Sequence, residues 1–207
     1  MFAIICTMFD DMSLLRAWRA GDTEAGNALF ERYFSSMHRF FANKSSQGVE
    51  DLIQETFLAC VNSLSRFRED ASFKTYLYGI AVNVLKSNLR KRARAESLDY
   101  GVTSIADIGP TPSQFAAQAQ ERGLLSEVLK HIPVDYQIAI ELHYFQDMSG
   151  VEIAAALNIS EGTVRSRLRR GLARLRRVLH RRGLSCDMFT RLPSSLDINE
   201  NESLRPL

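Results

Sequence analysis

Cysteine, tryptophan and long apolar runs are scarce in this sequence of 207 residues. The three cysteines, Cys6, Cys60 and Cys186, are scattered, form no CxxC pair and are not accompanied by clustered histidines. This pattern argues against a disulfide framework or a zinc site, and it suits a reducing cytoplasm. No apolar run approaches the roughly 20 residues that a transmembrane helix needs.

The opening segment MFAIICTMF is apolar but short, with no basic residue before it and no small-residue cleavage site close behind. We therefore expect no signal peptide. Met8 and Met12 are further candidate start residues.

Signatures of enzymes are also missing. The sequence has no Gly-rich phosphate loop and no convincing nucleophile–base pair, and His38, His131, His143 and His180 are isolated from one another. We expect a protein that is not an enzyme and that uses no cofactor or metal.

Positive charge is concentrated in two parts of the chain, although the formal net charge is only +2. Residues 1–95 carry thirteen Lys/Arg and ten Asp/Glu, whereas residues 96–148 carry two and eight. Residues 149–185 carry nine and two, and residues 186–207 carry two and four. The distribution predicts two basic units joined by an acidic connector.

Apolar residues recur at helical spacing on both sides of this connector, and strand-like alternation is nowhere sustained. Asp22 is placed to cap a helix from Thr23 to about Lys44. The apolar faces of two further helices are predicted to be Val49, Leu52, Ile53, Phe57, Cys60, Val61 and Leu64, and Phe73, Tyr76, Leu77, Ile80, Ala81, Val84 and Leu85. Glycines and prolines between Ser97 and Gln114 disfavour helix.

We therefore predict an all-α fold of two small helical domains, residues 12–95 and 119–183. A flexible acidic linker over 96–118 joins them. An N-terminal extension (1–11) and a disordered tail (184–207) complete the chain.

A helix-turn-helix is predicted in the second basic unit. Ser149 and Glu152 have the spacing of a capping box, which starts a short helix through Leu157. Asn158 tolerates the left-handed backbone of a tight turn, and Ser160 can cap the next helix. The residues spaced to pack the two helices together are Ile153, Ala154, Leu157, Ile159 and Val164.

The second helix is apolar on one side and cationic on the other. At about 100° per residue, an arc of about 80° holds Val164, Leu168, Leu172, Leu175 and Leu179. Outside it fall Arg165, Arg167, Arg169, Arg170, Arg174, Arg176, Arg177 and Arg181. A solvated face and a membrane-surface helix are the alternatives. The apolar side has no Trp or Phe anchor and a partner helix precedes it, so DNA binding is favoured, with the first turns in the major groove.

The helix that begins at Phe73 carries a different pattern. Its polar side is predicted to hold Lys74, Thr75, Tyr78, Asn83, Lys86, Arg90, Lys91 and Arg92. Aromatic rings interleaved with cations suit single-stranded DNA, where bases stack and cations follow phosphates. The alternative is that the aromatics are core residues, which we favour for Phe73.

These segments resemble regions of bacterial sigma factors of the sigma-70 family, and the match is closest to the extracytoplasmic-function group. GTVRSRLRRGLARLRR, preceded by EIAAALNIS, is similar to region 4. DLIQETFLACVNSLSRF is similar to region 2.2, and FREDASFKTYLYGIAVNVLKSNLRKR to regions 2.3 and 2.4. The resemblance covers about residues 12–182, including the order of the units. It implies a factor that binds core RNA polymerase and directs promoter recognition and transcription initiation.

The resemblance also implies partners and contact residues. The partners are core RNA polymerase, through its β′ clamp helices and β flap, promoter DNA and, where one exists, an anti-sigma factor. Contacts to the minus-35 element fall on Arg165, Ser166, Arg169 and Arg170. Contacts to the minus-10 element fall on Lys74, Tyr76, Asn83, Lys86 and Arg90, and a flipped base lies between Asn83 and the loop from Arg66 to Ser72. Contacts to core polymerase fall on Asp51, Gln54 and Glu55, although acids near a helix N-terminus also suit the helix dipole.

Three positions depart from the family's pattern. Tyr76 stands where Trp is common, Gln137 where Arg is frequent, and Gly150 in place of a frequent aromatic. The alternative function is a helix-turn-helix regulator whose N-terminal helices sense a ligand or dimerise. A helical RNA-binding or adaptor protein is the third class.

Overall fold

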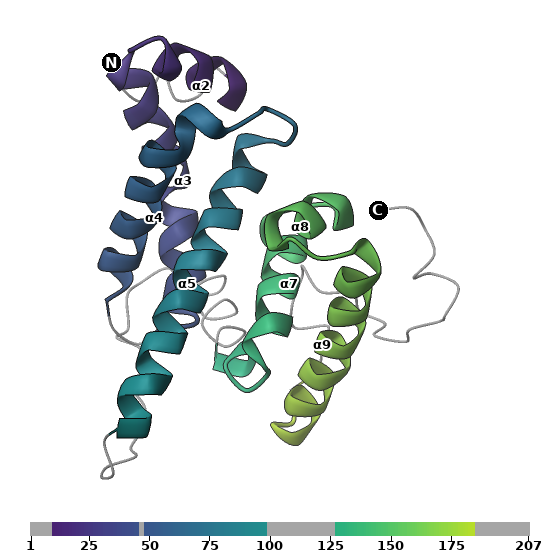
Figure 1. The fold of residues 1–207 in the computed structure, drawn as a ribbon. Coiled ribbons are helices and arrows are strands. Elements are labelled where there is room, and N and C mark those ends of the chain that lie inside the picture. The colour runs from purple at the N-terminus through teal and green to yellow at the C-terminus, as the bar shows by residue number, and fades with distance from the viewer. Residues whose placement is uncertain (1–9, 46–47, 99–126, 185–207) are drawn as a thin grey trace, which may run out of the picture. The chain divides into compact units, whose positions relative to one another are not determined.

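The structure, a computed structural model, describes residues 10–45, 48–98 and 127–184 (Figure 1). Every regular element in these ranges is a helix, which confirms the all-α prediction. In chain order they are α2 (Asp11–Arg19), α3 (Thr23–Ala42), α4 (Val49–Ser63), the 3-10 helix η1 (Leu64–Arg66), α5 (Phe73–Leu98), α7 (Val134–Tyr144), α8 (Gly150–Leu157) and α9 (Glu161–Arg181).

The chain divides by proximity into two compact units. One consists of Met1–Leu85 with Met148–Glu161, and the other of Lys86–Asp147 with Gly162–Leu207. Because α5 continues through Leu98, the first three residues assigned to the linker are helical. The rest of the linker up to residue 118, the tail from residue 185 and residues 1–9 of the extension lie outside the described residues.

Helix α3 begins where the sequence predicts. The Asp22 carboxylate accepts hydrogen bonds from the backbone N–H groups of Glu24 (3.0 Å) and Ala25 (3.2 Å), which satisfies donors that the first turn leaves unpaired. Asp10 caps α2 in the same way by accepting from the backbone N–H of Ser13. The capping of α2 places residues 10 and 11 of the predicted extension in the folded part of the chain.

The core of the first unit is aromatic. Phe40 of α3 meets Tyr78 of α5 edge to face, with ring centroids 5.6 Å apart, and Tyr33 lies 5.6 Å from Phe73. Phe73 is fully buried, which confirms its assignment to the core. The assignment of Thr75 and Tyr78 to the polar side of α5 was wrong. The tyrosine ring fills the space beside Phe40, and the Thr75 hydroxyl bonds the Ser72 hydroxyl at 2.9 Å.

Helix α4 buries only part of its predicted apolar face. Leu52, Ile53 and Cys60 are buried, whereas Val61 is 46% exposed, so its assignment to the core was wrong. Val61 lies at one edge of the predicted stripe and Leu52 at the other, and only the edge with Leu52 is covered. Burial raises the pKa of the Cys60 thiol to about 12, so this cysteine stays a neutral core residue.

In the second unit α7 packs against α9. Gly171 of α9 is buried, and a Cβ added to it would lie 3.0 Å from Ile140 Cδ1 and 3.0 Å from Tyr136 Cβ. The glycine therefore permits close approach of the two helices. Gln137, one of the three departures, is buried, and its Nε2 donates to the carbonyl of Ile132 at 2.8 Å.

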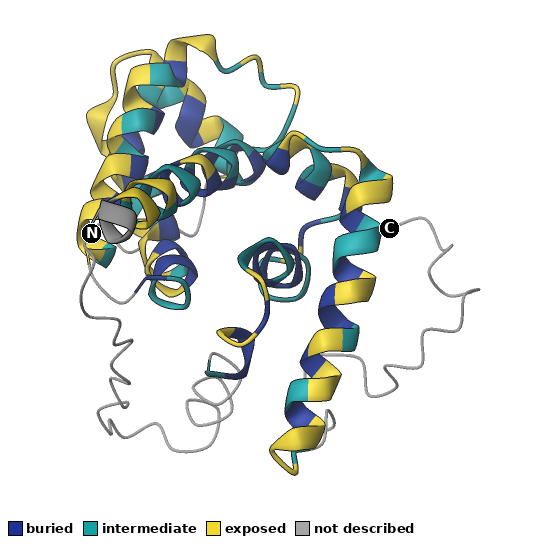
Figure 2. Ribbon diagram, turned by 60° about the horizontal axis from the view of Figure 1, so that its bottom comes forward, coloured by how far each residue is buried: buried dark blue, intermediate teal, exposed yellow. Residues whose placement is uncertain are grey.

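Each segment of the predicted helix-turn-helix has the local structure expected of it. Ser149 and Glu152 make both hydrogen bonds of a capping box at the start of α8. Asn158 follows α8 with φ 52°, the left-handed conformation expected of it. Three residues separate α8 from α9, and the predicted stripe Val164, Leu168, Leu172, Leu175 and Leu179 is buried throughout (Figure 2).

Candidate nucleic-acid interface

The predicted minus-35 residues on the cationic side of α9 differ in their exposure to solvent. Arg169 and Arg170 are exposed, whereas Arg165 and Ser166 are half-buried. At about 100° per residue, Ser166 and Arg170 lie within about 20° of the direction opposite Leu168, and Arg165 lies only about 60° from Leu168. Ser166 and Arg170 therefore project farthest from the buried stripe, and Arg165 lies at its margin.

Two arginines of α9 contact α7, one from a largely covered position and the other from an exposed one. Arg167 Nη2 lies 3.4 Å from Asp135 Oδ2, and the Arg167 side chain is only 20% exposed. The Arg174 guanidinium lies 5.7 Å from the centroid of the Tyr136 ring, within cation–π range. These two arginines lie on one flank of α9, and they help to hold α9 against α7.

A hollow lies beside the first turns of α9. Its lining residues are Pro133, Asp135, Tyr136, Thr163, Ser166, Arg167 and Arg170. Hydroxyls and guanidinium groups together can donate hydrogen bonds to phosphate oxygens. The exposed arginines and this hollow give the N-terminal half of α9 the chemistry of a DNA-binding surface.

Helix α5 brings together four of the five predicted minus-10 residues. At about 100° per residue, Tyr76, Asn83, Lys86 and Arg90 fall within an arc of about 80°. Asn83 and Arg90 are exposed, and Tyr76 and Lys86 are half-buried. Lys74 lies about 180° from Asn83 and is not part of this face.

Tyr76 is held against the loop that precedes α5. Its hydroxyl lies 2.5 Å from the Ser63 hydroxyl, and its ring centroid lies 4.4 Å from that of Phe67 at an interplanar angle of 31°. Partial burial raises the pKa of the Tyr76 phenol further above neutral pH, so the hydroxyl is a lasting hydrogen-bond partner of Ser63. The ring and the loop from Arg66 to Ser72 thus form one surface, with exposed Arg66 and Arg68 beside it.

The predicted polymerase-contact residues lie on an exposed face of α4. Asp51, Gln54 and Glu55 are all exposed, and the acids of the first turn also suit the positive end of the helix dipole. Leu58, which the sequence interpretation missed, is 58% exposed and lies between Gln54 and Asp51 around the helix. The sequence already indicated that Leu58 would be exposed, because this apolar residue falls outside the apolar stripe of α4.

In the part of the chain that the structure describes, no helix combines the length and apolarity needed to cross a membrane. No group of three or more His, Cys, Asp or Glu side chains there is arranged to hold a metal ion.

Two protein-family models match the chain. "Sigma-70 region 2" matches residues 28–95, which include α4 and most of α3 and α5. "Sigma-70, region 4" matches residues 122–175, which include α7, α8 and the first two-thirds of α9. The two matches follow the order predicted from the sequence.

Named relatives cover most of the chain. The ECF RNA polymerase sigma factor SigM of Mycobacterium tuberculosis is 32% identical over 171 residues, which are 82% of this chain and 84% of the relative. The ECF RNA polymerase sigma-E factor of Haemophilus influenzae is 30% identical over 170 residues, 76% of this chain and 89% of the relative.

Solved structures share the fold. The sigma factor RpoE from Bartonella quintana, in complex with the anti-sigma factor NepR, gives a TM-score of 0.61 at 27% identity, covering 70% of this chain and 91% of that chain. CnrH, in complex with the cytosolic domain of CnrY, gives a TM-score of 0.61 at 23% identity, covering 83% of this chain and 97% of that chain.

Proposed function

This chain belongs to the sigma-70 family of RNA polymerase sigma factors, in the extracytoplasmic-function group, and we propose the following division of work among its residues. Residues 12–95 act as region 2, which binds core polymerase and the minus-10 element. Residues 119–183 act as region 4, which binds the minus-35 element. The segment 96–118 links them. The protein works in the cytoplasm without enzymatic activity of its own.

The observation that carries this proposal is the presence of both regions in one chain, each with an exposed face of suitable chemistry. A helix-turn-helix occurs in many regulators and would be weak evidence alone. Region 2 with its acidic α4 face and its mixed aromatic and cationic α5 face distinguishes a sigma factor from a regulator with a sensor or dimerisation domain.

The polymerase-binding surface that we propose consists of Asp51, Gln54, Glu55 and Leu58 of α4. An exposed apolar side chain within a ring of polar ones has the anatomy of an interface centre. The acids would meet cations of the β′ clamp helices, and Leu58 would be desolvated on binding. Adding Leu58 extends the surface that the resemblance implied.

The promoter-binding surfaces follow the two basic faces. On α5, Asn83 can read a base edge with its amide while Lys86 and Arg90 follow phosphates of the melted strand. On α9, Arg169 and Arg170 are exposed near the end that a recognition helix inserts into the groove. Because the similar sigma factor RpoE from Bartonella quintana is solved in complex with the anti-sigma factor NepR, we also propose an anti-sigma factor as a partner of this chain.

The test is reconstitution of the full chain with purified core polymerase, followed by run-off transcription from a pool of promoter fragments. Transcription that starts at defined sites only when the chain is present is the expected result. Failure to bind core polymerase, together with binding to isolated DNA, would support the regulator instead.

Charge reversal tests the polymerase surface. Asp51→Arg with Glu55→Arg should weaken core binding without unfolding the chain, because both side chains are exposed. Asp51→Asn with Glu55→Gln is the matched control that keeps the shape and removes the charge, and we expect it to weaken binding less. Unchanged binding by a charge-reversed protein with a native circular dichroism spectrum would remove the assignment.

A further inference from the structure

Helix α2 is bound to the loop between η1 and α5 by two arginines. Arg19 Nη2 donates to the carbonyl oxygens of Leu64, at 2.8 Å, and Phe67, and Arg19 Nη1 donates to Glu69 Oε1 at 2.8 Å. Arg16 adds bonds to Glu69 Oε2 from Nη2 (3.1 Å) and Nε (3.3 Å). One guanidinium thus spans three acceptors of a segment that lies 45 to 50 residues later in the sequence.

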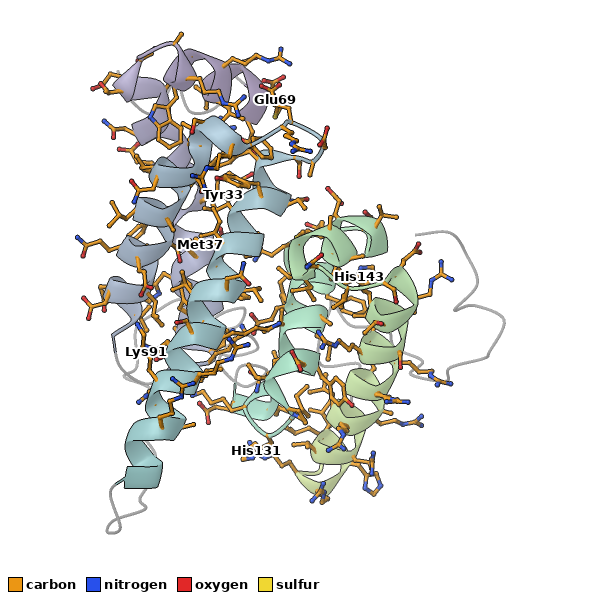
Figure 3. All side chains as sticks on the ribbon, viewed as in Figure 1. Tyr33, Met37, Glu69, Lys91, His131 and His143 are labelled. Atoms are coloured by element: carbon orange, nitrogen blue, oxygen red, sulfur yellow. The ribbon has the colours of Figure 1, made fainter. Side chains whose placement is uncertain are left out.

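The loop has a conformation that needs such support. Glu69 has φ 60°, in the left-handed region, where a non-glycine residue is uncommon and its backbone is strained. Its carboxylate accepts from both arginines, and Figure 3 labels Glu69 next to α2. Charge-assisted hydrogen bonds of this kind are among the strong ones in proteins, so they offset the backbone strain.

The same guanidinium reaches the face that we assign to the minus-10 strand. The Arg19 Cζ atom lies 5.7 Å from the centroid of the Phe67 ring. Phe67 in turn lies 4.4 Å, ring to ring, from Tyr76, whose hydroxyl lies 2.5 Å from that of Ser63. A path of direct contacts therefore joins Arg19 to the aromatic part of the α5 face.

We propose that Arg19 is a positioning residue for promoter recognition: it holds the loop from Arg66 to Ser72 in the shape that receives the unstacked minus-10 base. This inference rests on the proposed sigma-factor function and deepens it. Arginine is needed here because its planar guanidinium donates hydrogen bonds to two carbonyls and a carboxylate at once. A lysine ammonium on its flexible side chain cannot reproduce that geometry. Helix α2 thereby becomes part of the promoter-reading apparatus, although it contacts no base.

The experiment compares variants in holoenzyme reconstituted with core polymerase, on a library of promoters that differ only in the minus-10 element. The variants are Arg19→Ala, Arg19→Lys and Glu69→Gly, and exposed Arg39 of α3 supplies the control Arg39→Ala. We expect Arg19→Ala to reduce the ratio between the best and the worst minus-10 sequence about tenfold, which is about the loss that one mismatched base pair typically causes. Core binding should stay within about twofold of wild type.

The other variants separate positioning from folding. Arg19→Lys should restore part of the base preference. Glu69→Gly relieves the backbone strain but removes the carboxylate, so it should lower base preference like Arg19→Ala while leaving the melting temperature nearer to wild type. If Arg19→Ala lowers the folded fraction, Arg19→Lys and Glu69→Gly carry the test.

Two results would overturn the inference while the sigma-factor function stands. One is an unchanged base preference in folded Arg19→Ala and Glu69→Gly. The other is a loss by one common factor on every promoter, which would make Arg19 a structural residue only. A wild-type chain that supports no transcription with core polymerase would instead refute the proposed function itself.

Discussion

Replacing Arg170 and Arg177 one at a time should separate base reading from phosphate binding on α9. Both arginines are exposed and lie within about 20° of each other around the helix. They differ in position along it, because seven residues at about 1.5 Å each place Arg177 about 10 Å farther from the N-terminal end. A major groove about 12 Å wide accepts the first turns of a recognition helix, which include Arg170 and not Arg177.

The two substitutions should weaken DNA binding in different ways. Arg170→Ala should cost about 1–3 kcal/mol on the preferred duplex, or about 5- to 150-fold, and much less on duplexes altered at the contacted base pair. Arg177→Ala should weaken binding to all duplexes alike and reduce the salt slope by about 0.9 at most. The ratio of wild-type to Arg177→Ala affinity should then shrink about 3.5-fold between 50 and 200 mM salt.

Fluorescence anisotropy with the full chain measures both effects. A minus-35 duplex is first obtained by selection from a randomised pool, and single-base-pair variants of it are then titrated at several salt concentrations. Circular dichroism checks folding, which exposed arginines should affect little.

Two outcomes would refute the reasoning. Equal losses for both variants on every duplex would make α9 a general cationic surface. A changed base preference in Arg177→Ala alone would mean that the later turns of α9 enter the groove.

Four further perturbations follow from the structure. Asn83→Ala should change base preference in the minus-10 element more than total activity, as transcription from a library of minus-10 variants would reveal; an equal loss on all variants would mark a structural residue. Gly171→Ala should lower the free energy of unfolding by about 1 kcal/mol, because contact with Tyr136 Cβ at 3.0 Å outweighs the helix propensity of alanine, and a rise in denaturant midpoint would contradict this. Ser149→Ala should lower the free energy of unfolding by about 1 kcal/mol, because it removes the N-cap of α8. The hydrogen bond from the Ser149 backbone N–H lowers the pKa of Glu152 below 4.5, so the stability that Glu152 contributes is present above pH 4.5 and is lost as the pH falls below it. Urea unfolding of Glu152→Gln and wild type should therefore differ at neutral pH and converge in acid.

Features that depend on neighbours along the chain were predictable from the sequence. The cap of α3 by Asp22, the capping box of α8 and the left-handed turn at Asn158 all involve residues within four positions of one another. The buried stripe and cationic face of α9 follow from helical periodicity alone. These predictions were correct because a local hydrogen bond or a helical period depends only on nearby residues and not on the rest of the fold.

Features that depend on how helices pack were decided only by the tertiary structure. Periodicity placed Tyr78 on the polar side of α5 and Val61 in the core, yet Tyr78 is buried against Phe40 and Val61 is exposed. Nothing in the spacing of the arginines showed that Arg167 pairs with Asp135, or that Arg19 holds a loop 45 to 50 residues away. A periodic pattern shows which residues share a side of a helix. How wide a strip of that side is buried depends on which other helices pack against it. The distant residue that each side chain contacts is likewise set by the packing, because burial and ion pairing are properties of the packed chain.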